Sequence, residues 1–274
     1  MVVFNKELKL AEVLNEYDKE SLKYYARDLG LTGLSKLKKA ELVQLIADRI
    51  LDPEIMFYRG AILANRHVAI LEKGMNGPVE RDQDYDAIGT LNEMDFIACN
   101  HNEYVVPCDV AKVWKEINDD RFKAYRKKAS WVWKCINWVN DMYGFAHLDV
   151  VLKLVNVKKG IRIDSEELRE IFERFPDDEK LTYFFDDLFI ASYLAENIKA
   201  LERLRNAQAG KDYYIPSSAE VEEYADTGAL ISGKEYQNLQ CMVENDLGYS
   251  HEDATELMYE LWDSKSSIMD TINE

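Results

Sequence analysis

The most constraining feature of the sequence is a central segment, residues 121–143, that is apolar on two adjoining faces of a helix. Apolar residues recur there at intervals of three and four, which is the spacing of helical stripes. The first stripe contains Phe122, Tyr125, Ala129, Val132, Ile136, Val139 and Tyr143, and the second contains Trp131, Cys135, Trp138 and Met142. A helix that is apolar over more than half of its girth has to be buried, so we expect it to form part of the core.

The same segment is also basic, which permits a second interpretation. It holds six cations and no acid from Arg121 through Trp138. Basic residues interleaved with aromatic ones can form a platform for single-stranded nucleic acid. The helical spacing of the aromatic residues favours a core instead. The lysines would then lie on an exposed rim or pair with the acidic C-terminal part.

Composition limits the classes of protein to which the chain can belong. Its 274 residues suffice for two or three compact units, and 47% hydrophobic with 31% charged residues is typical of a soluble globular protein. Unbroken apolar runs reach only four or five residues, so no segment is expected to span a bilayer. Charges interrupt residues 1–14, which predicts no signal peptide and favours a cytoplasmic location.

The charge is distributed unevenly along the chain. Residues 121–160 hold nine Lys or Arg and two Asp or Glu, whereas residues 161–274 hold ten and twenty-seven. A net charge of −17 argues against a protein that coats nucleic acid over its whole surface. Residues 1–50, with nine basic and eight acidic residues, are nearly neutral, and their lysines are clustered.

The N-terminal fifty residues carry the most informative local pattern. Leu22, Ala26 and Leu29 follow helical spacing, and Gly30 is placed to end that helix. A short extended link with Leu31, Leu34 and Leu37 leads to a second helix near Lys38, which continues through Leu42 and Ile46 to Asp52-Pro53. Leu10, Val13 and Leu14 are expected to add a preceding turn.

This pattern resembles the N-terminal domain of the transcription terminator Rho and the wider SAP-like group of helix–extension–helix modules. The matching residues are Leu22, Ala26, Leu29, Gly30, Leu37, Lys38, Lys39, Leu42 and Ile46. In such modules the loop and the start of the second helix face nucleic acid or a partner protein. The resemblance therefore implies that Lys36, Lys38 and Lys39 contact a ligand, with Arg27 as a neighbour. The alternative is that these lysines are only the solvated face of a small structural cap.

Residues 52–120 follow the order of a winged helix. Helical patches precede a turn at Gly74 to Pro78 and a third helix at Tyr85 to Met94. Short apolar runs around residues 100–103 then predict a β-hairpin. The third helix and its flanks carry Asp82, Asp84, Asp86, Glu93 and Asp95, and such a helix would repel phosphate. If this unit is a winged helix, protein contact or packing is its expected role.

The remaining chain is also expected to be mainly helical. Leu148 to Val155 and Leu168 to Phe175 are predicted helices, followed by a hairpin near residues 183–190 or by one long helix from Leu181 to Leu204. The runs Glu103–Pro107 and Asp212–Pro216 suggest an internal duplication. Ser217 with Glu220 forms a capping box, and further helices follow near 236–243 and 254–262. The run from Tyr213 to Tyr224 weakly resembles a segment of uncharacterised bacterial proteins, which names no activity.

No motif in the sequence names a reaction, a cofactor or a metal. Nucleotide-binding glycine loops, HExxH and GxSxG are absent. Four scattered cysteines indicate neither disulfides nor a zinc ribbon; Cys99, His101 and Cys108 could be soft ligands, but no fourth ligand is evident. We therefore expect no cofactor and no metal, and no catalytic residue can be nominated.

Together these patterns predict a mainly α protein with one or two small β-hairpins. The expected parts are a Rho-like module (1–51), a winged-helix-like unit (52–120), a helical unit with a possible second hairpin (121–210) and a C-terminal helical region (211–274). The first functional hypothesis is a non-enzymatic, nucleic-acid-associated regulatory protein of bacterial or phage type, with DNA or RNA as its partner. The second is a protein-interaction adaptor that uses its acidic helical body. Neither hypothesis involves a membrane, and the sequence does not indicate an oligomeric state.

Overall fold

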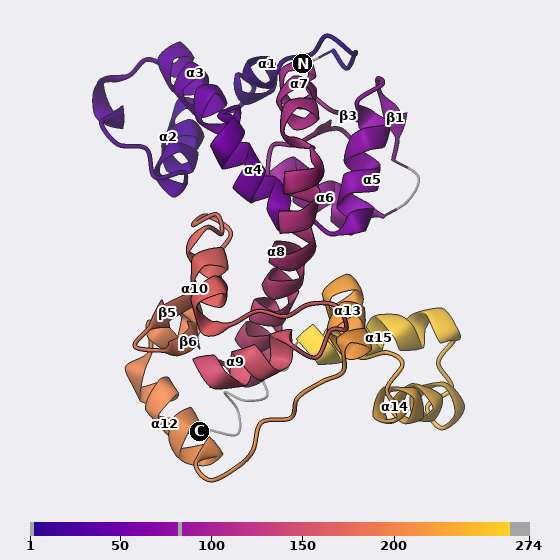
Figure 1. The fold of residues 1–274 in the computed structure, drawn as a ribbon. Helices are drawn as coiled ribbons and strands as arrows, with labels where there is room; N and C mark the ends of the chain where they lie inside the picture. The colour runs from indigo at the N-terminus through magenta and orange to yellow at the C-terminus, as the bar shows by residue number, and fades with distance from the viewer. Residues whose placement is uncertain (1–2, 82–83, 264–274) are drawn as a thin grey trace. The chain divides into compact units, whose positions relative to one another are not determined.

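The chain folds mainly into helices, with two small three-stranded antiparallel sheets, as the sequence predicts (Figure 1). The structure, a computed structural model, describes residues 3–81 and 84–263. Its helices within these residues include none that is both long and apolar enough to cross a membrane. All four cysteines are free.

Two compact units make up the molecule. Unit 1 contains Met1–Trp133 and Ile163–Tyr183, and unit 2 contains Lys134–Arg162 and Phe184–Glu274. The Rho-like module and the predicted winged-helix-like segment thus belong to the same unit. The division into four parts that the sequence suggests remains a prediction. The two compact units do not show which parts can fold independently.

The N-terminal module of unit 1 has the predicted helices. They are α1 (Leu10–Leu14), α2 (Lys19–Asp28) and α3 (Lys39–Ile50). Gly30 has a φ of +74°, the left-handed conformation that ends α2. The link between α2 and α3 is not simply extended as predicted: it contains a 3-10 turn, η1 (Leu34–Lys36), which buries Leu34 between the helices.

The next part of unit 1 contains the predicted hairpin and one further strand. The elements are α4 (Pro53–Ala61), α5 (Asn65–Gly74), β1 (Val79–Glu80), α6 (Tyr85–Glu93), β2 (Ala98–Cys99), β3 (Glu103–Val105) and α7 (Cys108–Ile117). The strand order is β1-β3-β2, with Val79 opposite Tyr104 and Ala98 opposite Val105. Two residues are too short for a strand to show alternation, so β1 escaped the sequence pattern.

The central helix α8 (Asp120–Trp138) is buried on the faces that its apolar stripes predict. Phe122, Val132 and Ile136 of the first stripe are buried, and so are Trp131 and Trp138 of the second. The tryptophans therefore belong to the core and do not form a platform for nucleic acid. The helix continues as a π-helical turn, η2 (Val139–Tyr143), which ends at Gly144.

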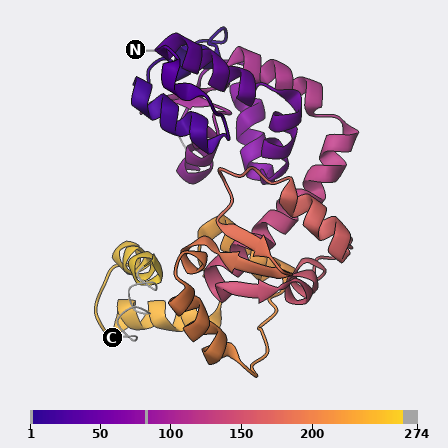
Figure 2. The ribbon, with the colours of Figure 1, turned by 90° about the vertical axis from the view of Figure 1, so that its left-hand side faces the viewer.

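A second sheet follows, with strand order β4-β6-β5 (Figure 2). Its strands are β4 (Phe145–His147), β5 (Thr182–Phe185) and β6 (Leu188–Ala191), and the helices α9 (Leu148–Val155) and α10 (Ser165–Glu173) come between β4 and β5 in the chain. The hairpin prediction is confirmed, and the alternative of one long helix is wrong. Asp186 and Asp187 form the turn with φ values of 50° and 60°, so the chain reverses where a helix would have continued.

In each sheet, the strand that comes last in the chain is the central one. The two similar runs that suggested an internal duplication, however, do not lie in equivalent elements. Glu103–Val105 is strand β3, whereas residues 212–216 have no regular structure. The rest of unit 2 is helical. Its helices are α11 (Ser192–Ala195), α12 (Ile198–Gln208), α13 (Ser218–Thr227), α14 (Lys234–Asn245) and α15 (His251–Asp263).

Candidate functional site

The four residues that the Rho-like resemblance selects do not have equivalent surroundings. Lys36 ends η1 and Lys38 caps α3; both are exposed, and neither forms an ion pair with a described residue. Lys39 is half-buried, and its Nζ donates a hydrogen bond of 2.6 Å to the carbonyl oxygen of Asn15. Lys39 therefore ties the start of α3 to the segment after α1, and of the three lysines only Lys36 and Lys38 are open to a ligand.

The start of α3 already has an anion of its own. The backbone N–H of Lys38 donates to the Glu41 carboxylate at 2.6 Å. A helix N-terminus attracts anions through its free N–H groups and its dipole, and here Glu41 takes part of that attraction. A phosphate at this place would thus be bound mainly by the side chains of Lys36 and Lys38.

Arg27 is exposed on the last turn of α2, and it brings a residue that the sequence reasoning missed. Its guanidinium lies over the ring of Tyr24, 5.3 Å from the ring centroid, and the Tyr24 ring is exposed as well. A cation beside an exposed aromatic ring can both contact phosphate and stack on a base. The i, i+3 spacing of Tyr24 and Arg27 could have indicated this pair. We use the name module face for Tyr24, Arg27, Lys36 and Lys38.

Tyr25, on α2, connects the N-terminal module to a buried carboxylate of the next part of unit 1. The Tyr25 hydroxyl donates a hydrogen bond to Asp95, which follows α6 with a left-handed φ of 58°. Burial raises the pKa of Asp95 to about 6, against smaller opposing effects of Tyr25 and Arg59. Burial and the Asp95 carboxylate both raise the pKa of Tyr25, so the phenol stays a donor.

Arg59 is the cation at the centre of this region. It lies on α4, is buried, and contacts Asp178 at 2.5 Å and Glu179 at 3.5 Å. Its Nη2 also lies 3.5 Å from the carbonyl oxygen of Met94. Together with Tyr25 and Asp95, these residues form what we call the buried charge cluster. It joins the N-terminal module, the residues after α6 and the residues after α10 within unit 1.

A pocket of about 250 Å³ lies beside this cluster. Its lining residues are Tyr17, Ser21, Leu22, Tyr25, Asn92, Glu93 and Asp95. The carboxylates of Glu93 and Asp95 would repel a phosphate. The pocket therefore does not extend the module face.

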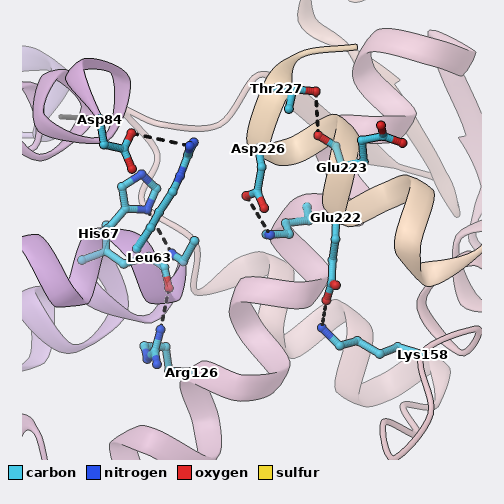
Figure 3. Close-up of polar contacts among 12 residues, drawn as sticks. Leu63, His67, Asp84, Arg126, Lys158, Glu222, Glu223, Asp226 and Thr227 are labelled. Atoms are coloured by element: carbon cyan, nitrogen blue, oxygen red, sulfur yellow. Dashed lines mark hydrogen bonds and ion pairs between the residues drawn. The ribbon is translucent and has the colours of Figure 1, made fainter. Parts of the chain in front are cut away.

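Two of the basic residues of α8 in unit 1, Arg126 and Lys128, are engaged within the fold, whereas Arg121, Lys123 and Lys127 are exposed. Arg126 donates 2.8 Å hydrogen bonds to the Leu63 carbonyl oxygen, drawn in Figure 3, and to the Asn65 side chain. Lys128 pairs with Glu167 at 2.5 Å. Arg126 and Lys128 hold neighbouring elements together, so these two cations are not free for a ligand.

In unit 2 the basic residues meet acids of α13, as the sequence allowed. Lys134 pairs with Asp226 at 3.3 Å, and Lys158 pairs with Glu222 at 2.5 Å. Figure 3 shows Glu222 and Asp226 extending from α13 toward these partners. The basic middle and the acidic C-terminal part are thus partly neutralised within the unit.

The cysteine and histidine residues considered as soft ligands do not form a metal site in the described part of the chain. No group of three or more His, Cys, Asp or Glu that could hold a metal ion occurs there. Cys99 lies on β2 and Cys108 begins α7. Burial raises the pKa of the Cys99 thiol, which keeps it protonated.

Comparison of the chain with protein-family models, with curated proteins and with solved structures found no match.

Proposed function

We propose that the chain is a nucleic-acid-associated protein that docks through the module face, as its resemblance to Rho-like modules implies. The supporting observation is the placement of four side chains. Lys36 and Lys38 are exposed and without a described ion-pair partner at the start of α3, and Arg27 is stacked on the exposed ring of Tyr24.

Electrostatics limits the proposed contact to this small face. The chain carries a net charge of −17, and Arg126, Lys128 and Lys134 of α8 are engaged with partners in their own units. Long nucleic acid along the acidic body would be repelled. Two lysines and one arginine would bind a short stretch of backbone, and Tyr24 would favour a single strand whose bases are free to stack.

A salt-titrated binding assay tests this proposal. Fluorescent single-stranded RNA, single-stranded DNA and duplex DNA of about 20 nucleotides are titrated with the full chain. The variant Arg27→Ala/Lys36→Ala/Lys38→Ala should lower affinity for every sequence and reduce the salt slope by about 1 for each phosphate that the variant can no longer bind. Tyr24→Ala should weaken single-strand binding more than duplex binding.

The matched control removes the same charge from another exposed surface. Lys199→Ala/Arg203→Ala/Arg205→Ala changes three exposed cations of α12. If the module-face variant and the α12 variant bind alike, the cations act only through net charge and the proposal is wrong. Absence of salt-dependent binding by the wild-type chain would also refute it.

An adaptor that binds proteins is the second candidate function. Its support is the acidity of unit 2, where α13 keeps Glu222 and Asp226 in ion pairs while many other acids remain on the surface. The same assay separates the two candidates, because an adaptor would bind none of the three nucleic acids.

A further inference from the structure

The two C-terminal helices form a small helical hairpin with a thin core. Helices α14 and α15 contact each other and are drawn in yellow in Figures 1 and 2. Val243, Ala254 and Met258 are buried between them, with Tyr236 and Leu257 packed alongside. One face of α14 is thus used for packing on α15, and its remaining surface is available for another role.

The outer surface of α14 and the loop after it expose large apolar side chains. The exposed fractions are 43% for Leu239, 53% for Met242, 60% for Leu247 and 45% for Tyr249. Leu239 and Met242 are three residues apart and lie on the same side of α14. We call these four residues the α14 surface. Single exposed apolar residues are common on proteins, so their grouping is what requires an explanation.

Beyond its first turn, the exposed part of α14 also lacks charge. Every exposed residue between positions 237 and 245 is uncharged: Gln237, Asn238, Leu239, Cys241, Met242 and Asn245. This is unexpected in a chain with 31% charged residues. On α12, by contrast, Lys199, Glu202 and Arg203 are exposed. Depletion of charge together with exposed methionine and tyrosine is the composition of the centre of a protein interface.

Acidic residues border this uncharged centre. Glu235 and Asp246 lie at the two ends of α14, and Glu252 and Asp253 open α15; all four are exposed. Lys234 is the one lysine or arginine among residues 234–258. Apart from Lys234 the border is acidic, and it favours a partner whose border is basic.

We propose that the α14 surface binds a protein partner that presents an apolar patch bordered by lysine or arginine. A second copy of this chain is a poor occupant, because a two-fold contact would place the same acids opposite each other. An anionic membrane surface would be repelled for the same reason. This inference uses residues outside the module face, so it does not depend on the proposed nucleic-acid contact.

The test uses a pair of synthetic amphipathic peptides of about 14 residues as probes. Both have one leucine-rich helical face; one has lysine along its borders and the other has glutamate. Fluorescence anisotropy measures their binding to the full chain. The lysine peptide should bind, and Leu239→Ser/Met242→Ser should weaken it by about tenfold or more. The glutamate peptide should not bind.

Two further variants make the result specific. Ile198→Ser removes an exposed apolar side chain of α12 and should leave peptide binding unchanged. Leu239→Lys/Met242→Lys should weaken the lysine peptide further, because it removes the apolar contact and places positive charge opposite the lysine border of the peptide. Since the altered residues are exposed, circular dichroism should show unchanged helix content.

Equal binding of the lysine peptide to the wild-type chain and to Leu239→Ser/Met242→Ser would overturn the proposal, because the attraction would then be only electrostatic. Self-association of the wild-type chain in sedimentation experiments, abolished in that variant, would overturn it in favour of a second copy.

Discussion

Unit 1 and unit 2 each contain an ion pair with the same short nitrogen–oxygen distance, 2.5 Å, but in different surroundings. In unit 1 the side chains of Arg59 and Asp178 are 3% and 13% exposed. In unit 2 the side chains of Lys158 and Glu222 are 32% and 45% exposed. The distance between the charged atoms is the same in the two pairs, so it does not explain a difference in what they contribute.

Burial changes what such a pair does for the protein. Charges taken out of water lose hydration, and they interact strongly because the surroundings screen them weakly. Removal of one partner of the Arg59 pair should therefore lower the stability of the fold strongly. The intact pair is nevertheless not evidence of a large net gain in folding free energy. The Lys158 pair remains hydrated and screened, so its contribution is small. The predictions below test this contrast from the largest expected effect to the smallest.

Removal of the buried cation should have the largest effect. Arg59→Met leaves Asp178 and Glu179 without their buried partner and should lower the free energy of unfolding by about 3 kcal/mol. Urea denaturation measures the loss. Arg174→Met in the same unit is the control, because its 3.7 Å contact with Glu54 is exposed and should contribute less than about 0.5 kcal/mol. Equal losses in the two variants would contradict the role of burial.

The pH dependence of stability should reveal Asp95. Burial raises its pKa from 3.8 to about 6, so between these values the folded chain binds more protons at this site than the unfolded chain. The contribution of Asp95 to stability should therefore fall as pH rises from about 4 to about 6 and stay low above that range. Relative to wild type, Asp95→Asn should gain about 2.4 kcal/mol between pH 4 and pH 7, because the remainder of the effect lies below pH 4.

The urea midpoints of the wild-type chain and of Asp95→Asn are measured across this pH range, and their difference is followed. The titration of the other carboxylates affects both proteins and therefore cancels in that difference. A constant difference would show that Asp95 titrates normally.

Loss of the half-exposed pair in unit 2 should have a small effect. Lys158→Met removes the ion pair with Glu222 and should cost about 0.5 to 1 kcal/mol. Adding about 1 M salt to the wild-type chain should remove most of the same contribution. Thermal unfolding of the wild-type chain and of Lys158→Met at low and high salt measures the contribution of this ion pair. A loss of stability as large as that of Arg59→Met would contradict the expected effect of burial.

The module-face cations should have the least effect on stability. Lys36→Ala/Lys38→Ala changes two exposed side chains without described ion-pair partners and should alter the free energy of unfolding by less than about 0.5 kcal/mol. Lys39→Ala, at the neighbouring position, should cost about 1 kcal/mol because its hydrogen bond to the Asn15 carbonyl is removed. Urea midpoints that rank these variants in the opposite order would show that Lys39 is not the structural lysine.

The sequence predicted those parts of the fold that depend on local spacing. Helix α9 begins and ends where its apolar pattern does, and Gly30 ends α2 because only a residue without a side chain adopts that φ easily. The buried charge cluster could not be predicted in this way. Tyr25 and Asp95 are 70 residues apart, and Arg59 and Asp178 are 119 apart. Periodicity in a single sequence relates residues a few positions apart, so it does not predict contacts between residues this distant along the chain.

The candidate site was predictable only in part, for a related reason. Periodicity places Lys36, Lys38 and Lys39 near the start of one helix, but it does not say which nitrogen finds an acceptor within the fold. Lys39 does so at Asn15, whereas the two others stay exposed. Charge counts had the same limit in α8, where Arg126, Lys128 and Lys134 of the basic run make internal contacts.

Helix α12 has a consequence for how the chain would be degraded. None of its residues is buried. Leu204 packs closely against Gly144, since a Cβ atom added to this glycine would lie 2.8 Å from the leucine side chain. A helix without a buried residue has few contacts to lose, so we expect α12 to open at a small free-energy cost even though Gln208 donates a hydrogen bond to the Tyr143 carbonyl oxygen. The helix also carries Lys199, Arg203 and Arg205, each exposed. Trypsin should therefore nick the native chain within α12 early, and this helix would set the lifetime of the protein in the presence of such proteases.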